Sequence, residues 1–201
     1  MKHGSVDNLL KMYSQATRWE KEKGRQYYQK QRERLRDLGA TYGFTLEASS
    51  GAFAALSPNK RESDTYRDLT ACMKHVQTNG TGHPKVSAYR RNCDKALIIL
   101  RGRNPQNVLK GSKVLNFYYN TMDPENPRWV TVDGHLVSAW TGTRLTMKRW
   151  AGITAREYQQ ISRHVMEAAE RVGILPCQFH STIWLVQRRI NKDGSQLPLD
   201  F

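Results

Sequence analysis

The sequence is poor in cysteine and in long apolar runs. Its three cysteines are far apart and odd in number, which favours reduced thiols over a disulfide framework or a Cys-x-x-Cys metal site. No apolar run approaches the roughly 18 residues that a membrane span requires, and the N-terminus has no uninterrupted signal-peptide core. We therefore expect a cytoplasmic protein without membrane association. The cysteines are Cys72, Cys93 and Cys177.

Metal-ligand patterns and acidic residues are also scarce. The six histidines are scattered without metal-ligand spacing, so we expect no metal and no cofactor. Against 32 Lys and Arg there are 18 Asp and Glu, which gives a net charge of +14 and a pI near 9.9. Such a balance attracts polyanions and makes nucleic acid the first partner to consider, although the same charge would also keep a protein soluble.

Helical periodicity runs through most of the 201 residues. This length suits one well-buried core, and we predict an all-α protein: a single, monomeric globular domain of roughly eight or more helices. The Val130–Val132 run is the one short extended segment that the pattern indicates. The first helix is predicted over residues 5–38, capped by Asp7 and ended by Gly39. Further helices are predicted over residues 45–56, 61–76, 86–100, 105–109, 136–140, 154–172 and 176–190, with another beginning near Lys113.

These elements suggest a charged N-terminal helix in residues 1–40, a core in residues 45–190 and a tail in residues 191–201. The charged half of the first helix is typical of a solvated face rather than of a dedicated DNA-binding arm. The Thr146–Trp150 segment is interpreted as a loop.

The stretch Val108–His135 brings two reactive side-chain types to the starts of two helices. A glycine turn leads into the helix near Lys113, and a Pro- and Asn-rich loop leads through Trp-Val-Thr-Val to Asp133. The Lys113 amine and the Asp133 carboxylate are therefore candidate catalytic groups at the starts of two neighbouring helices.

Three motifs resemble those of the helix-hairpin-helix DNA glycosylase superfamily, in a small, divergent, phage-type form. They are Gly111-Ser112-Lys113-Val114, Val132-Asp133-Gly134-His135, and the upstream Ala55-Leu56-Ser57-Pro58-Asn59. The likeness covers about residues 45–190. It implies an enzyme that flips a damaged or modified base out of duplex DNA and excises it, in the host cytoplasm if a phage encodes it.

The resemblance also implies residue roles. Asp133 would stabilise positive charge on the sugar, and Lys113 would form a Schiff base in a bifunctional glycosylase/lyase. Asn59 would probe the gap in the duplex. DNA contacts would include Lys60, Arg61, Lys110, Gly111 and Ser112, and His135, Trp129 and Trp140 would line the base pocket or orient the base.

The hairpin departs from the family pattern. It is short and has one glycine, so phosphate contact would rest on Lys110, Ser112 and the helix N-terminus. The four-cysteine iron–sulfur motif of some members is absent, so no cluster is expected.

Each site residue also has an ordinary structural interpretation. Asp133 could cap the following helix, Lys113 could be an exposed helix residue, and Asn59 could serve its own turn. His135 could be a structural hydrogen-bonder, and the tryptophans could belong to the core. Two other functions stay open: an enzyme that alters a hypermodified base, and a non-catalytic DNA-binding module. RNA in place of DNA also stays open.

Overall fold

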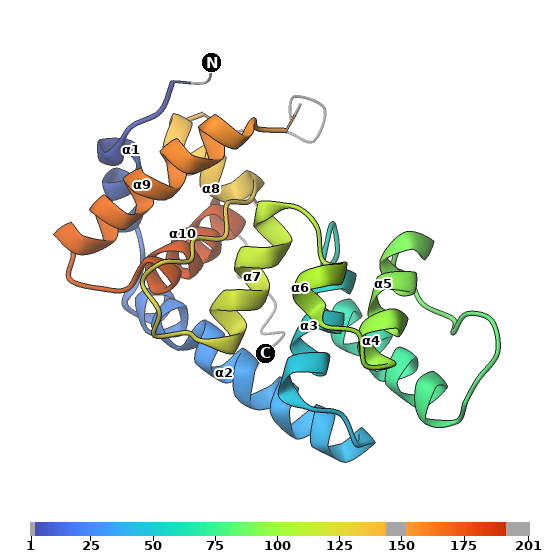
Figure 1. The fold of residues 1–201 in the computed structure, drawn as a ribbon. Helices are drawn as coiled ribbons and strands as arrows, with labels where there is room; N and C mark the ends of the chain where they lie inside the picture. Colours follow the sequence, from blue (N-terminus) through green and yellow to red (C-terminus); the bar gives the residue numbers. More distant parts are fainter. Residues whose placement is uncertain (1–2, 144–151, 192–201) are drawn as a thin grey trace. The chain divides into compact units, whose positions relative to one another are not determined.

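The computed structural model describes residues 3–143 and 152–191, which form ten α-helices and no strand (Figure 1). The all-α prediction is confirmed. The predicted Thr146–Trp150 loop and the tail from residue 192 lie outside the described residues. Among the described helices, none is long and apolar enough to cross a membrane. The helices are α1 (Val6–Ser14), α2 (Arg18–Tyr42), α3 (Leu46–Leu56), α4 (Glu62–Gln77), α5 (Arg90–Leu100), α6 (Pro105–Val108), α7 (Ser112–Met122), α8 (Gly134–Thr141), α9 (Ala155–Arg171) and α10 (Pro176–Asn191).

The chain divides into two compact units. Unit 1 comprises the described residues up to Tyr28 and those from Asp123 onward, and unit 2 comprises Gln29–Met122. Helix α2 continues from the first unit into the second, because the boundary falls between Tyr28 and Gln29. The single domain expected from chain length stays a prediction.

The predicted helix over residues 5–38 is wrong, because two helices occupy this region. Thr17 caps the second one: the Glu20 N–H donates to Thr17 Oγ1 at 3.1 Å, and the Thr17 N–H donates to the Glu20 carboxylate at 2.8 Å. This reciprocal pair is a capping box, which starts a second helix after α1 has ended at Ser14. The first cap is Ser5 rather than Asp7, since the Ser5 side chain accepts from the Asn8 N–H.

Gly39 does not end α2 as predicted. A Cβ at this position would lie 2.8 Å from the carbonyl oxygen of Phe44 and would also strike Ser49, so the glycine permits close helix approach within unit 2. Helix α2 continues to Tyr42, and Gly43 follows it with φ of 78°. Glycine adopts this left-handed conformation without steric cost, which is the usual way for a helix to end.

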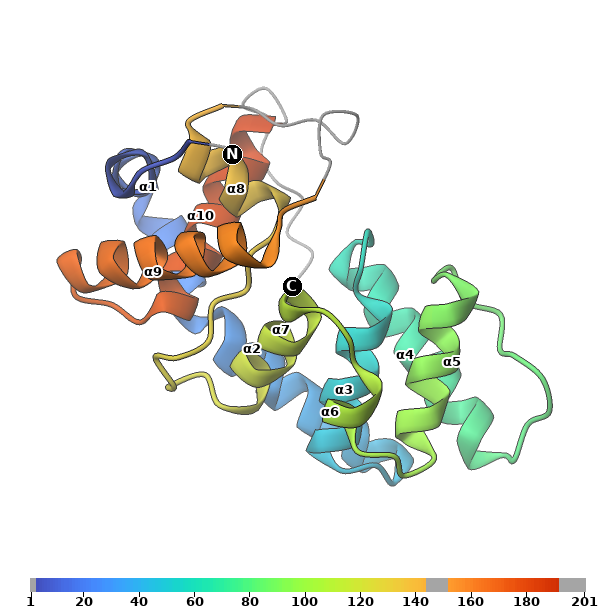
Figure 2. The same ribbon diagram turned by 45° about the horizontal axis from the view of Figure 1, so that its top comes forward.

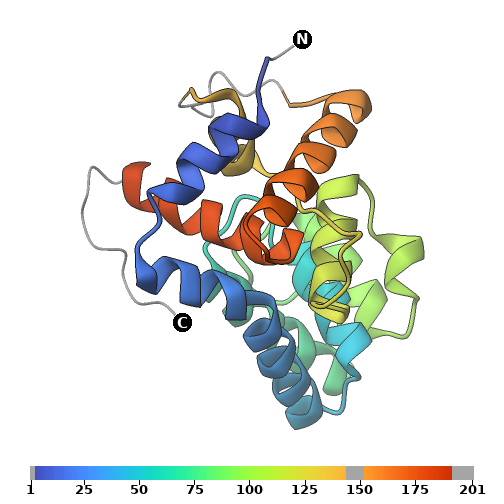
Figure 3. The same cartoon turned by 90° about the vertical axis from the view of Figure 1, so that its left-hand side faces the viewer.

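In unit 1, four helices enclose an apolar core. Helix α1 packs against α8, α9 and α10, and α8 also packs against α10 (Figure 3). Trp140, Leu136, Phe179 and Ile183 are fully buried there. The capping box predicted at the start of α9 is confirmed, with Thr154 and Glu157 bonded reciprocally.

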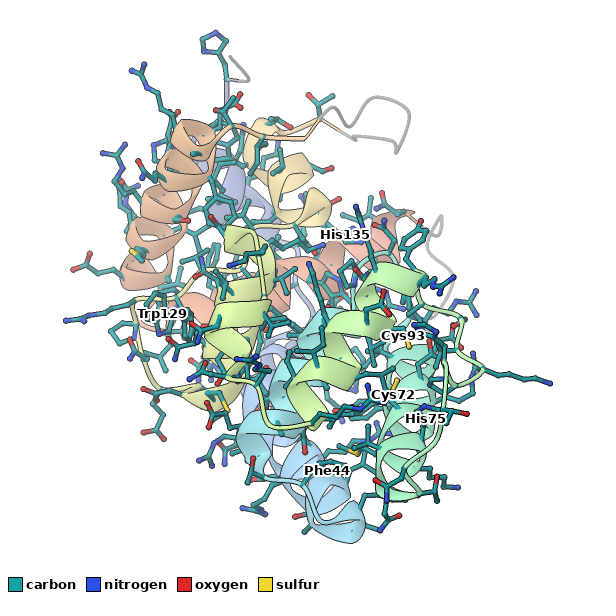
Figure 4. All side chains as sticks on the ribbon, turned by 45° about the vertical axis from the view of Figure 1, so that its right-hand side comes forward. Phe44, Cys72, His75, Cys93, Trp129 and His135 are labelled. Carbon is teal, nitrogen blue, oxygen red and sulfur yellow. The ribbon has the colours of Figure 1, made fainter. Side chains whose placement is uncertain are left out.

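In unit 2, the small-residue helix α3 lies between α4, α5 and α7 (Figure 2). A Cβ at Gly51 would lie within 2.7 Å of the Pro105 ring, so the glycine allows α6 to approach α3 closely. Between α4 and α5, the buried Cys72 and Cys93 thiols are 4.0 Å apart as free cysteines (Figure 4). Burial raises the pKa of both thiols, which keeps them protonated and poorly nucleophilic.

Candidate functional site

The predicted hairpin lies between α6 and α7 in unit 2. Leu109 is buried and anchors it, whereas Lys110, Gly111, Ser112 and Lys113 are all exposed. Gly111 has φ of 87°, and its carbonyl accepts from the Leu115 N–H at 3.1 Å, which closes the first turn of α7. The N–H groups of a first helical turn have no acceptor within their helix, so they and the two lysines can contact a phosphate. One glycine is enough to make this turn.

The turn between α3 and α4 holds three predicted DNA contacts, and two of them are exposed. Asn59 projects from the turn with φ of 61°, a left-handed conformation that asparagine tolerates better than most residues. Arg61 is exposed at the start of α4. The Lys60 side chain is only 8% exposed and its ammonium pairs with the Asp68 carboxylate. The predicted DNA contact of Lys60 is therefore corrected, because this ammonium already has a buried partner.

Asp68 holds three parts of unit 2 together. Its carboxylate accepts from the Lys60 ammonium and, at 2.9 Å each, from the backbone N–H groups of Ser87 and Ala88. Burial by itself raises the pKa of this carboxyl, but Lys60 and the two N–H groups outweigh it and hold the pKa below its ordinary value. The turn that carries Asn59 is thus fixed beside the segment that leads into α5.

A dense basic segment, residues 85–113, is a candidate binding feature that the sequence motifs indicate only at its hairpin end. It contains eight Lys and Arg residues against one acidic residue, Asp94, a net charge of +7 out of +14 for the chain. Seven of the eight are exposed and Lys95 is half-buried. A count of charges along the chain could have found it, whereas apolar periodicity indicates only the helix. The eight residues are Lys85, Arg90, Arg91, Lys95, Arg101, Arg103, Lys110 and Lys113.

The solvent face of α5 carries part of this charge. Arg91, Lys95 and Ile98 recur at four- and three-residue steps along α5, and Arg101 follows as its C-cap residue. Arg91, Ile98 and Arg101 are exposed, and Lys95 is half-buried. Figures 1 and 2 show that the α3–α4 turn and the first turn of α7 lie at the same end of unit 2. The elements that carry Arg61 and the hairpin lysines therefore meet at one end of unit 2.

In unit 1, Asp133 caps α8. Its carboxylate accepts from the Leu136 N–H at 2.9 Å, as the structural interpretation of this residue predicts. The Asp133 side chain is 14% exposed, and its Oδ1 lies 4.0 Å from His180 Nε2. The other ring nitrogen of His180 is 3.5 Å from the Tyr28 hydroxyl, which donates to Thr131 Oγ1 at 3.2 Å. The carboxylate thus belongs to a largely buried polar cluster whose members are too far apart in sequence for a motif to indicate.

The three predicted base-pocket residues do not come together as a set. Trp140 is fully buried in the core of unit 1 and its indole N–H donates to His164 Nδ1 at 2.9 Å, so its assignment to the lining of a base pocket is corrected. His135 is half-buried, with Nδ1 3.4 Å from the Asn191 side-chain nitrogen. Trp129 is also half-buried, and Figure 4 shows it apart from His135.

The amine and carboxylate of the predicted pair belong to different units. Lys113 lies in unit 2 and Asp133 in unit 1, so their joint action stays a prediction. In the part of the chain that the structure describes, no group of three or more His, Cys, Asp or Glu residues could hold a metal ion.

No curated protein and no solved structure matches the chain. One family model matches residues 2–191, and its description is "Family of unknown function (DUF7178)".

Proposed function

The chain belongs to the DUF7178 family, and we propose that it is a DNA-binding protein whose unit 2 contacts the phosphate backbone. The observation that carries the proposal is the exposed basic segment, residues 85–113, with its net charge of +7. Lys and Arg that neutralise phosphates release condensed counterions, and this release supplies most of the affinity of sequence-independent DNA binding.

Two features favour DNA over a small anion. The basic residues extend along α5 and on to the hairpin at the start of α7, as an extended polyanion requires. The hairpin adds exposed backbone N–H groups beside Lys110 and Lys113, and such groups contact phosphate oxygens in many DNA complexes. We therefore assign the hairpin and α5 to the backbone contact.

Reversing three charges on this surface is expected to weaken DNA binding strongly. The variant Arg91→Glu/Lys110→Glu/Lys113→Glu should bind a labelled duplex on the order of 100-fold more weakly in low salt, because fewer phosphates are neutralised and fewer counterions are released. The slope of log K against log salt should become shallower by about 0.9 for each phosphate that the variant no longer neutralises. Fluorescence anisotropy across a salt series measures both quantities.

A matched control changes the same charge elsewhere. Lys11, Arg156 and Arg163 are exposed in unit 1, so their triple replacement by Glu gives an identical change in net charge. This control should keep most of the affinity. Equal weakening in both triple variants would show that bulk charge, and not the surface of unit 2, governs binding.

We propose base excision at Asp133 as a second candidate function. It is favoured by the placement of a partly exposed carboxylate within 4.0 Å of His180, at the position that resembles the glycosylase motif. A fixed carboxylate stabilises the oxocarbenium-like state that forms as the base departs. Lys113 would add lyase activity by forming a Schiff base with the sugar.

Asp133→Asn separates capping from chemistry. Asn caps a helix about as well as Asp, so the variant should fold like the wild type. Base release from a panel of lesion-bearing duplexes should nevertheless fall on the order of 100-fold or more, because the carboxylate charge is gone. Borohydride trapping tests Lys113 separately. Equal release by Asp133→Asn and the wild type, or no release by either, would reject the enzyme candidate and leave DNA binding standing.

A further inference from the structure

Tyr89 is a large aromatic side chain exposed at the edge of the basic surface. It is 60% exposed and stands immediately before α5 as its N-cap residue. Its side chain makes no capping hydrogen bond, although its carbonyl accepts from the N–H groups of Asn92 at 2.8 Å and Cys93 at 3.0 Å. The helix start thus depends on the Tyr89 backbone, and the ring is not used for capping.

The backbone on the other side of Tyr89 is also fixed. Ser87 and Ala88 both donate backbone N–H groups to the buried Asp68 carboxylate. Hydrogen bonds therefore fix the backbone on both sides of Tyr89, while its ring is exposed to solvent. Because the backbone that carries the ring is already fixed, little backbone entropy is lost when the ring binds a partner, and this favours stacking.

The charged residues that flank Tyr89 most closely in the sequence are basic. Arg90 and Arg91 follow it directly and Lys85 precedes it by four residues, and all three are exposed. The nearest acidic residue in the segment, Asp94, is already paired with His83 at 2.5 Å. An exposed aromatic ring among cations is complementary to a strand that offers both bases and phosphates.

We infer that Tyr89 stacks on an unpaired base of a DNA strand whose phosphates contact Arg90, Arg91 and Lys85. This inference rests on the proposed DNA binding and adds a substrate class to it: DNA with an unstacked base, such as a single-base bulge. Base–aromatic stacking tolerates any base identity, because every base has a π face. Tyr89 thus confers preference for unpaired structure over regular duplex.

Tyr89→Ala tests the inference. Wild-type protein is titrated against a fluorescent duplex and against the same duplex with a central single-base bulge. Tyr89→Ala should bind the bulged duplex about tenfold more weakly and the regular duplex as before, with the salt slope unchanged because no charge is altered. Tyr89→Phe keeps the ring and should restore the preference. Trp19→Ala, which removes a partly exposed aromatic side chain of unit 1, should behave like the wild type.

A crosslinking experiment reads out the stacking partner directly. With 5-iodouracil as the bulged base, irradiation should attach the strand to the peptide that contains Tyr89, as mass spectrometry would show. If Tyr89→Ala retains the bulge preference, or if crosslinks map elsewhere, the stacking role is overturned while DNA binding survives. If wild-type protein binds neither duplex, the proposed function itself fails, and the inference falls with it.

Discussion

Replacing Asp68 by alanine is expected to lower the free energy of unfolding by about 3–5 kcal/mol. The Asp68 and Lys60 side chains are 2% and 8% exposed, so the variant leaves an ammonium buried without its counter-charge. The N–H groups of Ser87 and Ala88 are deprived of their acceptor at the same time. Urea denaturation followed by circular dichroism measures the destabilisation. Asp64→Ala, on the same helix but paired at the surface with Arg67, should cost less than about 1 kcal/mol.

The double variant Lys60→Met/Asp68→Leu should recover part of this stability. Removing both charges together avoids an unpaired buried ion, and apolar replacements of buried pairs are often neutral. Recovery should stay partial because Ser87 and Ala88 still lack an acceptor. A destabilisation below about 1 kcal/mol in Asp68→Ala would contradict the buried pair.

Acid should act through the same carboxyl. The pKa of Asp68 is lowered in the folded protein, so its stabilisation is fully present above the unfolded pKa of about 4 and is lost as pH falls through the folded value. Wild-type stability should therefore fall on acidification below about pH 4, and Asp68→Asn should lack this part of the dependence. Denaturation midpoints measured from neutral to acid pH give the comparison.

Replacing Trp140 by alanine is expected to lower the free energy of unfolding by about 3–5 kcal/mol. The indole is fully buried in unit 1, and the truncation leaves a cavity and removes the hydrogen bond to His164. The Trp140 carbonyl accepts from the Ser5 N–H and the Asn8 side chain, so α1 is attached to α8 at this residue. Loosening of α8 would therefore be transmitted to the N-terminal helix.

Trp19→Ala provides the comparison for Trp140. Trp19 is 38% exposed on α2, so its truncation should cost clearly less stability than that of Trp140. Thermal or urea unfolding distinguishes the two variants. Similar destabilisation by Trp19→Ala and Trp140→Ala would show that Trp140 is not a core residue.

Local signals predict most helices correctly because caps and breaks act within a few residues. The capping box at Thr154 and Glu157 is visible in the sequence and predicts the helix that it starts. The same pattern at Thr17 and Glu20 does not reveal a second helix start, because the residues on both sides of it favour one continuous helix. Gly39 misleads for a different reason, since a glycine that ends a helix and one that admits a neighbouring helix look identical in sequence.

The candidate site is predicted less completely. The exposed hairpin at Lys110–Lys113 and the cap at Asp133 follow from local turn chemistry, so the sequence could indicate both. Lys60 could not be distinguished from Arg61 as a DNA contact, because its partner Asp68 is reached only when α4 folds. Trp140 could not be identified as a core residue from the sequence, because only the tertiary structure shows that it is fully buried.

The sequence by itself determined the all-α class, the positions of most helices and the strong positive charge, because periodicity, capping and net charge are properties of local order and composition. Only the tertiary structure decided which charges remain exposed and which are buried in pairs, and that Tyr89 is presented beside Arg90 and Arg91. The physical reason is that burial depends on contacts between residues distant in sequence. Asp68 illustrates it, since one carboxylate joins the turn at Lys60 to the segment at Ser87 and Ala88.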